Sequence, residues 1–146
     1  MTRYHFQIVD TAQSHRLDAE LLEGQVLVES GGQADAFAYD HGFYLNYVRN
    51  NPQALARRFG PLAACSYGLL QCELETVYER GFQGLPHQLF DPAIGLEWGA
   101  RQLAYLLAYF HGDYTRALEA YNAGIGNLPA GNGYAQKVYE QAKALR

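Results

Sequence analysis

The chain has 146 residues, of which 49% are hydrophobic and 18% are charged, and this composition excludes a disordered or low-complexity protein. The length suits one domain around a single core, so we expect residues 1–146 to form one domain. Eleven Lys and Arg against 15 Asp and Glu give a formal net charge of −4, with no basic run. Nucleic acid is therefore not an expected partner, because such binding depends largely on neutralising phosphates.

Helix start and stop signals recur along the chain, and no convincing strand alternation appears. Asp18, Asp91 and Asp113 each stand where an aspartate can cap the N-terminus of a helix, and Pro92 follows Asp91 at the first helical position. Gly residues stand where helices should end. The expected helices cover residues 4–14, 19–30, a short segment between 52 and 60, 66–80 with Ser66 as its cap, 91–111, 114–123 and 134–145.

These elements predict an all-α fold of six or seven helices with little or no sheet. The helix over residues 91–111 should be central and the most buried, because five large residues recur on it in helical register. They are Ile94, Trp98, Gln102, Tyr105 and Tyr109. We expect Trp98 to lie in the core.

The two cysteines are Cys65 and Cys72. On one continuous helix their Cα atoms would lie about 10 Å apart, which is too far for a disulfide. We therefore expect two buried free thiols. A disulfide is the alternative if the helix begins after Cys65.

No metal or other cofactor is expected. The five histidines show none of the spacings of a zinc site, and no Cys-x-x-Cys pair occurs. They are His5, His15, His41, His87 and His111.

Glu29 is the residue that most clearly indicates chemistry. It shares a helical stripe with Leu22 and Val26, which should face the core, and it lies in the last turn before Gly31. Burial and the negative end of the helix dipole both disfavour a charged carboxylate, so the pKa of Glu29 should be raised. A carboxylic acid that stays protonated near neutral pH can act as a general acid on a glycosidic oxygen.

Three later segments place amide and tyrosine side chains at helix ends, where they could contact a polymer. Glycine before Gln71 would let a chain approach the backbone closely, and an amide both donates and accepts hydrogen bonds. The segments are Ser66-Tyr67-Gly68-Leu69-Leu70-Gln71, Ala120-Tyr121-Asn122-Ala123-Gly124 and Tyr134-Ala135-Gln136-Lys137-Val138.

In order and spacing, Glu29-Ser30 and these segments resemble the soluble lytic transglycosylase (SLT) domain of the lysozyme-like superfamily, over roughly residues 18–143. The resemblance implies an α-rich lysozyme-like fold and makes Glu29 the sole catalytic carboxylate. It implies that Ser30 is a structural hydroxyl beside Glu29, and that Tyr134 orients Glu29. It places Gln71, Tyr121 and Asn122 against the glycan; Ser30 and Tyr134 are counted with this substrate-binding set.

Two features depart from the family pattern. Leu70 stands where the family usually has Met, an apolar exchange of similar volume. The interval from Ser30 to Ser66 is longer than in compact members, and its aromatic stretch over residues 40–48 is expected to add a wall to the cleft. Outside the core, Tyr39, Tyr44 and Tyr121 are the tyrosines that we expect to stack on sugar rings.

The resemblance implies cleavage of the β-1,4 bond between N-acetylmuramic acid and N-acetylglucosamine in peptidoglycan, with formation of a 1,6-anhydro ring. A hydrolytic muramidase is the nearest alternative. It would need a second carboxylate to position water, for which Asp35, Asp40 and Glu73 are the candidates. A non-catalytic helical module that binds glycan or serves a structural role is a third alternative.

The N-terminal sequence bears on where the protein acts. Residues 1–7 lack the apolar core of a secretory signal, and no stretch approaches the roughly 20 apolar residues of a membrane span. We therefore expect synthesis in the cytoplasm without a signal peptide. A phage-type member acting on the bacterial wall, as a lysis protein or a virion component, is the expected setting. A processed bacterial enzyme used in wall remodelling is the alternative source, and a monomer is the expected state.

Overall fold

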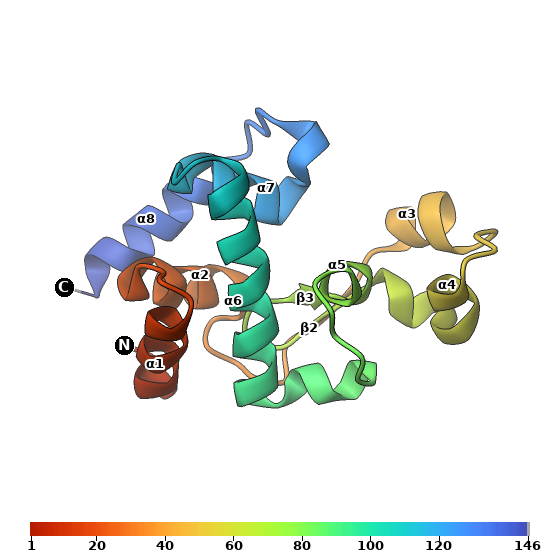
Figure 1. Cartoon of the computed structure of the whole chain (residues 1–146), viewed down its shortest axis with the longest axis horizontal. Coiled ribbons are helices and arrows are strands. Elements are labelled where there is room, and N and C mark those ends of the chain that lie inside the picture. Colours follow the sequence, from red (N-terminus) through yellow and green to blue (C-terminus); the bar gives the residue numbers. More distant parts are fainter. Residues whose placement is uncertain (146) are drawn as a thin grey trace.

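A computed structural model describes residues 1–145, in which eight α-helices surround a small antiparallel sheet (Figure 1). The α-helices are α1 (His5–Ser14), α2 (Ala19–Ser30), α3 (His41–Phe43), α4 (Ala54–Phe59), α5 (Leu74–Glu79), α6 (Pro92–Tyr109), α7 (Tyr114–Ala123) and α8 (Tyr134–Ala144). The strands are β1 (Phe37–Tyr39), β2 (Cys65–Tyr67) and β3 (Cys72–Glu73). The prediction of an α-rich fold with little sheet is confirmed. No helix in the described residues is both long and apolar enough to cross a membrane.

The three predicted N-terminal caps all form. The Asp18 carboxylate accepts a hydrogen bond from the Leu21 N–H at 3.0 Å, and the Asp113 carboxylate accepts one from the Arg116 N–H at 3.2 Å. Asp91 accepts from the backbone N–H of the second residue of α6 at 2.9 Å. These short-range contacts fix where α2, α6 and α7 begin.

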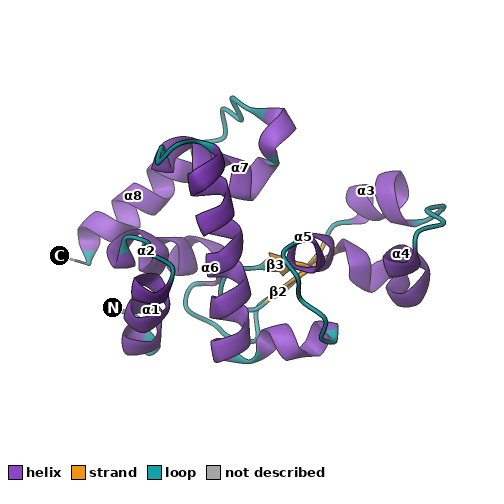
Figure 2. Ribbon diagram, in the orientation of Figure 1, coloured by secondary structure: helices purple, strands orange, loops and turns teal. Residues whose placement is uncertain are grey.

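Helix α6 runs through the middle of the fold, with α1, α2 and α8 on one side and α5 and the sheet on the other (Figures 1 and 2). The prediction of which residues of α6 are buried is wrong. Its buried residues are Gly95, Leu96, Gly99, Ala100, Leu103 and Leu106. Tyr105 and Tyr109 are exposed, and Trp98 packs on the edge of the core only half-buried. Leucines and small residues allow close packing, whereas tyrosines keep their hydroxyls in water.

The prediction of a helix that begins at Ser66 is also wrong. This segment forms β2, a tight turn and β3, and α5 begins only at Leu74 (Figure 2). The backbone is left-handed at Gly68 (φ +76°) and at Gln71 (φ +47°), so a right-handed helix does not continue through the turn. Ser66 on β2 pairs with Glu73 on β3, and β2 also pairs with β1 in antiparallel register.

This hairpin explains the cysteines. Cys65 lies opposite Tyr39 in the sheet and Cys72 lies opposite Tyr67, so the two thiols do not face each other. Both are buried and free. The prediction of two buried free thiols is confirmed, and the disulfide alternative is wrong although the helix does begin after Cys65.

Close packing of α8 on α2 brings the chain's last helix beside Glu29. A Cβ atom at Gly24 would lie 2.7 Å from the Val138 carbonyl oxygen, so only glycine lets the two backbones approach this closely. On the other side of α2, the buried Glu23 carboxylate pairs with His5 of α1 at 2.7 Å.

Residues 41–64 form a separate lobe that extends from the sheet (Figure 1). It contains α3, a π-helical turn (Tyr44–Val48), α4 and a 3-10 turn (Gly60–Ala64), around a small core of its own. That core consists of Val48, Ala56, Ala63 and Ala64. The segment is thus more helical than predicted, although α4 lies where the short helix was expected. Two further 3-10 turns cover Pro86–Phe90 and Ile125–Asn127.

Candidate active site

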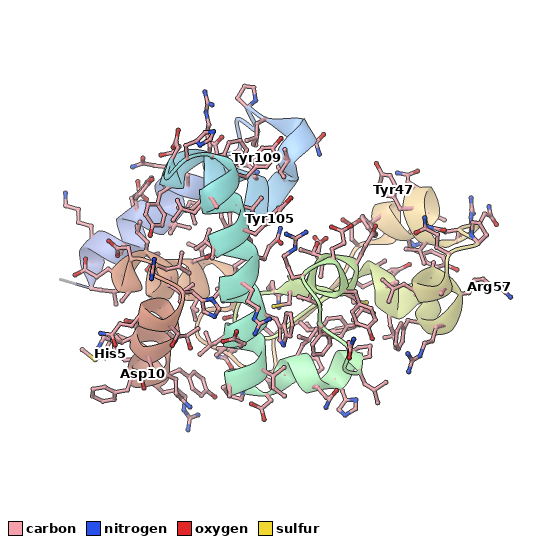
Figure 3. All side chains as sticks on the ribbon, viewed as in Figure 1. His5, Asp10, Tyr47, Arg57, Tyr105 and Tyr109 are labelled. Carbon is pink, nitrogen blue, oxygen red and sulfur yellow. The ribbon has the colours of Figure 1, made fainter. Side chains whose placement is uncertain are left out.

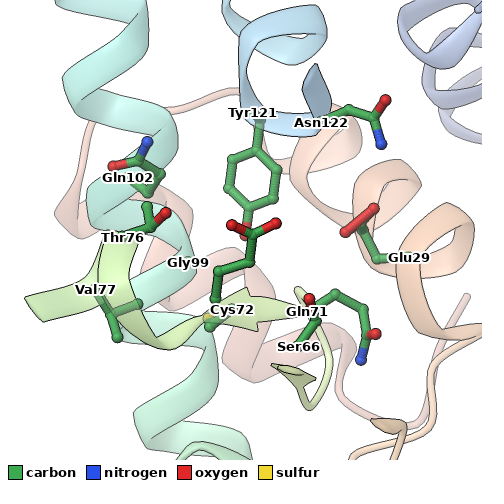
Figure 4. A pocket seen from close by; sticks show the side chains of 11 residues that line it. Glu29, Ser66, Gln71, Cys72, Thr76, Val77, Gly99, Gln102, Tyr121 and Asn122 are labelled. Atoms are coloured by element: carbon green, nitrogen blue, oxygen red, sulfur yellow. The ribbon is translucent and has the colours of Figure 1, made fainter. Parts of the chain in front are cut away.

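Glu29 lies at the end of α2 and faces a small pocket of about 70 Å³ (Figure 4). Gly31, in the left-handed conformation, ends the helix by donating its N–H to the Leu27 carbonyl. Burial, above all, and the nearby Glu73 carboxylate raise the pKa of Glu29 to about 7. The pocket is lined by Glu29, Ser66, Gln71, Cys72, Glu73, Thr76, Val77, Gly99, Gln102, Tyr121 and Asn122.

Tyr134, the first residue of α8, adjoins Glu29. Its hydroxyl is buried and forms no hydrogen bond of ordinary geometry within the described residues, yet it lies near enough to lower the pKa of Glu29. Burial, above all, and the Glu29 charge raise the pKa of Tyr134 far above its usual range. Gln25, one turn before Glu29, is fully buried beside the same hydroxyl and has no hydrogen-bond partner for its amide. Gln25 lowers the pKa of Tyr134, so the Tyr134 hydroxyl lies within reach of both Gln25 and Glu29.

Replacing Tyr134 by Phe should shift the pH dependence of any activity that uses Glu29 as an acid. Loss of the hydroxyl removes an interaction that favours ionised Glu29, so the pKa of Glu29 should rise above its present value of about 7. We expect the alkaline limb of the pH–rate profile to shift upward by up to about one unit. An alkaline limb unmoved in Tyr134→Phe, with folding intact by circular dichroism, would contradict this role.

Gln71 sits in the turn between β2 and β3, in a left-handed backbone conformation. Its Nε2 donates to the Ala36 and Gly68 carbonyls, both at 3.1 Å, and the residue lines the Glu29 pocket. Ser30 is adjacent to Glu29 but closes the helix end instead of lining the pocket. Its hydroxyl donates to the Val26 carbonyl at 2.9 Å and accepts from the Gly32 N–H at 3.2 Å.

Tyr121 and Asn122, at the end of α7, line the pocket from the opposite side (Figure 4). The Tyr121 hydroxyl donates to the Leu70 carbonyl at 2.6 Å, which ties α7 to the turn that carries Gln71. Asn132 then joins α7 to α8, because its amide donates to Asn122 at 2.6 Å while its oxygen accepts from the Tyr134 N–H at 3.1 Å. Four of the six predicted site residues, Glu29 among them, therefore line one pocket.

The three candidates for a second carboxylate separate in the structure. Asp35 lies by a different hollow, near the N-terminus. Asp40 caps α3 by accepting from the Phe43 N–H at 2.9 Å and lies on the rim of the wider groove described below. Glu73 alone shares the pocket with Glu29; desolvation of its carboxyl group, with Asp40 close by, raises its pKa.

A wider groove of about 490 Å³ continues from the Glu29 pocket. The two share five lining residues: Glu73, Thr76, Gln102, Tyr121 and Asn122. Asp40, Phe43 and Tyr47 of the lobe form its outer wall, so the aromatic stretch over residues 40–48 does line the cleft. Of the tyrosines that we expect to stack on sugars, Tyr121 lines the groove.

Tyr39 and Tyr44 do not line this groove and instead pack with His41. The prediction that Gly68 is a glycine so that a polymer can approach the backbone is also wrong. A Cβ there would lie 2.4 Å from the Leu89 carbonyl oxygen, so the glycine serves the packing of the fold and not a passing polymer. Sequence reasoning missed Gln25 and Gln102, both polar residues within apolar helical runs, which is the signal that could have found them.

Among residues 1–145, no group of three or more His, Cys, Asp or Glu side chains is arranged to hold a metal ion.

Comparison with known proteins gives the family. The model of the transglycosylase SLT domain matches residues 7–143, nearly the whole chain. The chain belongs to this family. The resemblance inferred from the sequence is confirmed, and so, at the level of the family, is the predicted enzyme class of lytic transglycosylase.

The lytic transglycosylase Slt of Pseudomonas aeruginosa, solved as an inactive Glu-to-Gln mutant, has the same fold as this SLT domain. The TM-score is 0.70 at 19% identity, over 96% of this chain. This chain spans 23% of the length of that protein. No curated protein matches the sequence.

Proposed function

We propose that this SLT domain cleaves the β-1,4 bond between N-acetylmuramic acid and N-acetylglucosamine in peptidoglycan, with Glu29 as its sole general acid and base. One observation carries the proposal: a carboxyl group with a pKa of about 7 faces a pocket that shares five lining residues with a groove of about 490 Å³. At neutral pH a substantial fraction of Glu29 is protonated, as the first step of the reaction requires.

The mechanism needs one carboxyl group. Protonated Glu29 donates its proton to the glycosidic oxygen as the C1–O bond breaks, and the substrate's own N-acetyl group stabilises the cation that develops. Glu29, now a carboxylate, takes the proton from the 6-hydroxyl of the muramoyl sugar as O6 attacks C1. A 1,6-anhydro ring forms, no water is consumed, and Glu29 is protonated again. Tyr134 is suited to hold the Glu29 carboxylate between the two steps.

Product analysis tests the reaction type. Purified cell walls digested with the protein should release muropeptides with 1,6-anhydro ends, identified by mass spectrometry. Products one water heavier would indicate a muramidase. No release of glycan fragments under any pH or salt condition would favour the non-catalytic module.

Hydrolysis remains a second candidate because Glu73 shares the pocket with Glu29. If Glu73 positioned water, Glu73→Gln would lose about 100-fold or more of the activity. We expect instead that Glu73→Gln keeps its activity within about threefold and still makes anhydro products. Because Glu73 raises the pKa of Glu29, its removal should lower the alkaline limb of the pH–rate profile.

The biological setting of the reaction stays a prediction. A phage lysis protein, a virion component and a bacterial enzyme of wall remodelling are the candidates. Detection of the protein in purified phage particles would favour the virion component, and a removed leader encoded by the full gene would favour the bacterial enzyme. Peptidoglycan strands are the proposed partner. A single copy contains every residue that the mechanism uses, which is consistent with a monomer.

A further inference from the structure

Gln25 is a fully buried amide on the helix that carries Glu29. Polar side chains such as Asp10 and Arg57 project into solvent (Figure 3), whereas the side chain of Gln25 is 0% exposed. Neither its Nε2 nor its Oε1 has a hydrogen-bond partner of ordinary geometry among residues 1–145. Burying an amide in this way is costly, and an apolar side chain would fill the same space without that cost. The amide therefore indicates a role other than packing.

The polar neighbours of this amide are Glu29 and Tyr134. Gln25 lies four residues before Glu29, so the two side chains leave α2 on the same face. Tyr134, the first residue of α8, has a hydroxyl that is likewise buried and without a partner of ordinary geometry in the described chain. Gln25 lowers the pKa of Tyr134, as a donor to the phenol oxygen does, and Tyr134 lowers the pKa of Glu29. The three side chains thus follow one another in the order Gln25, Tyr134, Glu29.

The direction of one hydrogen atom links these groups. A tyrosine hydroxyl has a single hydrogen to donate and an oxygen that can accept. An amide N–H that donates to the Tyr134 oxygen leaves the phenol hydrogen to point at Glu29. Hydrogen bonds in such a chain strengthen one another, so Tyr134 becomes the stronger donor. A donor at Glu29 favours its carboxylate form, which is the form that accepts a proton in the second step of the proposed reaction.

We propose that Gln25 is a positioning residue that acts on Glu29 through Tyr134: its amide donates to the phenol oxygen and so turns the phenol hydrogen toward the Glu29 carboxylate. This inference rests on the proposed function, because it assigns Gln25 to the step in which Glu29 is the base. Gln25 is not among the described residues that line the Glu29 pocket or the wider groove. Its removal should therefore lower kcat and leave KM unchanged.

The other titratable groups around Glu29 do not provide this link. Among the described residues, Tyr134 of α8, Tyr121 of α7, and Cys72 and Glu73 of β3 face it. Burial raises the pKa of the Tyr121 phenol and of the Cys72 thiol, so both are neutral near pH 7. In this group only the pKa of Tyr134 depends on the Gln25 amide. A change at that amide should thus reach Glu29 through the Tyr134 hydroxyl.

The test measures the pKa of Glu29 directly, from the side-chain carboxyl signal in ¹³C NMR of protein labelled at glutamate. Gln25→Met keeps the length of the side chain and removes the amide. It should raise the pKa of Glu29 by about 0.3–0.5 unit, roughly half of the shift expected for Tyr134→Phe. The double variant should show the shift of Tyr134→Phe alone, because no hydroxyl remains for Gln25 to act on.

Kinetics on soluble glycan strands give the second measurement. At pH 5, where Glu29 is protonated in both proteins, Gln25→Met should lower kcat about threefold to fivefold at unchanged KM. Gln136→Met makes the same exchange at an exposed position of α8 and is the matched control, which should behave as wild type in both measurements.

The possible contradictions differ from one another. An unmoved pKa of Glu29 in Gln25→Met would show that the amide only fills space. An equal shift with and without the Tyr134 hydroxyl would show that Gln25 acts on Glu29 by another route. If Gln25→Met does not fold, wild type decides alone: an Nε2–H signal of Gln25 in ¹H–¹⁵N NMR should shift with the pKa of Glu29, and a signal that ignores pH would overturn the proposal. A wild type that cleaves no glycan would overturn the proposed function, while the pKa measurements would still test the link between the three side chains.

Discussion

Replacing Glu29 by Gln should abolish wall clearing, with kcat lowered at least about 1,000-fold. General acid–base catalysis typically contributes 10²–10⁴-fold, and here one carboxyl group would serve as acid in the first step and as base in the second. Gln has nearly the same shape but neither donates an acidic proton nor accepts one. Turbidity loss of purified cell walls measures the effect, and Glu29→Gln that clears walls as fast as wild type would refute the assignment.

The same variant makes a second, independent measurement possible, because the raised pKa of Glu29 links folding to pH. The pKa of Glu29 is about 7 in the folded state and near the ordinary glutamate value of 4.5 in the unfolded chain. Between these values the folded state binds more protons, so the free energy of unfolding of wild type should fall as pH rises through this range. At pH 8 the loss should be on the order of 2–3 kcal/mol.

Glu29→Gln should lack this loss and should be more stable than wild type at pH 8, though not at pH 4. Urea denaturation at both pH values measures the difference. Glu140→Gln, an exposed glutamate on α8, is the control and should follow the wild-type pH dependence. If the active-site variant also followed it, the carboxyl group would be solvated and its pKa ordinary. Activity of wild type should likewise decline as pH rises through about 7, since the acid form of Glu29 is lost.

The sequence predicted what depends on near neighbours along the chain. Asp18, Asp91 and Asp113 cap their helices because a carboxylate reaches a backbone N–H two or three residues later, and no tertiary contact is needed. Glu29 could be predicted as the candidate acid because the sequence pattern shows both the apolar helical stripe that it shares and the helix end at Gly31. Its pKa depends in addition on groups from β3 and α8, which only the fold supplies.

The hairpin over residues 65–73 was not predictable in this way. Its residues alternate poorly, and the turn depends on a left-handed backbone at Gln71, a conformation that a glutamine rarely adopts and that its sequence does not announce. The groove likewise forms only when the chain folds, because its lining residues come from segments far apart in the sequence. Arg80 follows α5 and Gln102 lies on α6, and only the folded chain brings both residues to the groove, where Arg80 stacks on Tyr105.

Replacing Gly68 by Ala should cost about 3 kcal/mol of stability and lower Tm by roughly 10 °C. Two penalties combine at this position. The backbone has φ +76°, which strains any residue with a Cβ, and that Cβ would lie 2.4 Å from the carbonyl oxygen of Leu89. Leu89 is fully buried, so its backbone has little room to move away.

A second glycine separates the two penalties. Gly112 has a similar left-handed backbone (φ +87°), but a Cβ there would meet no atom within 4 Å. Gly112→Ala should therefore pay only the backbone strain, about 1 kcal/mol, and lower Tm by a few degrees. Equal losses in the two variants, measured by thermal unfolding, would mean that the contact with Leu89 yields easily. A larger loss at Gly68 would show that close packing against Leu89 holds the turn that precedes Gln71.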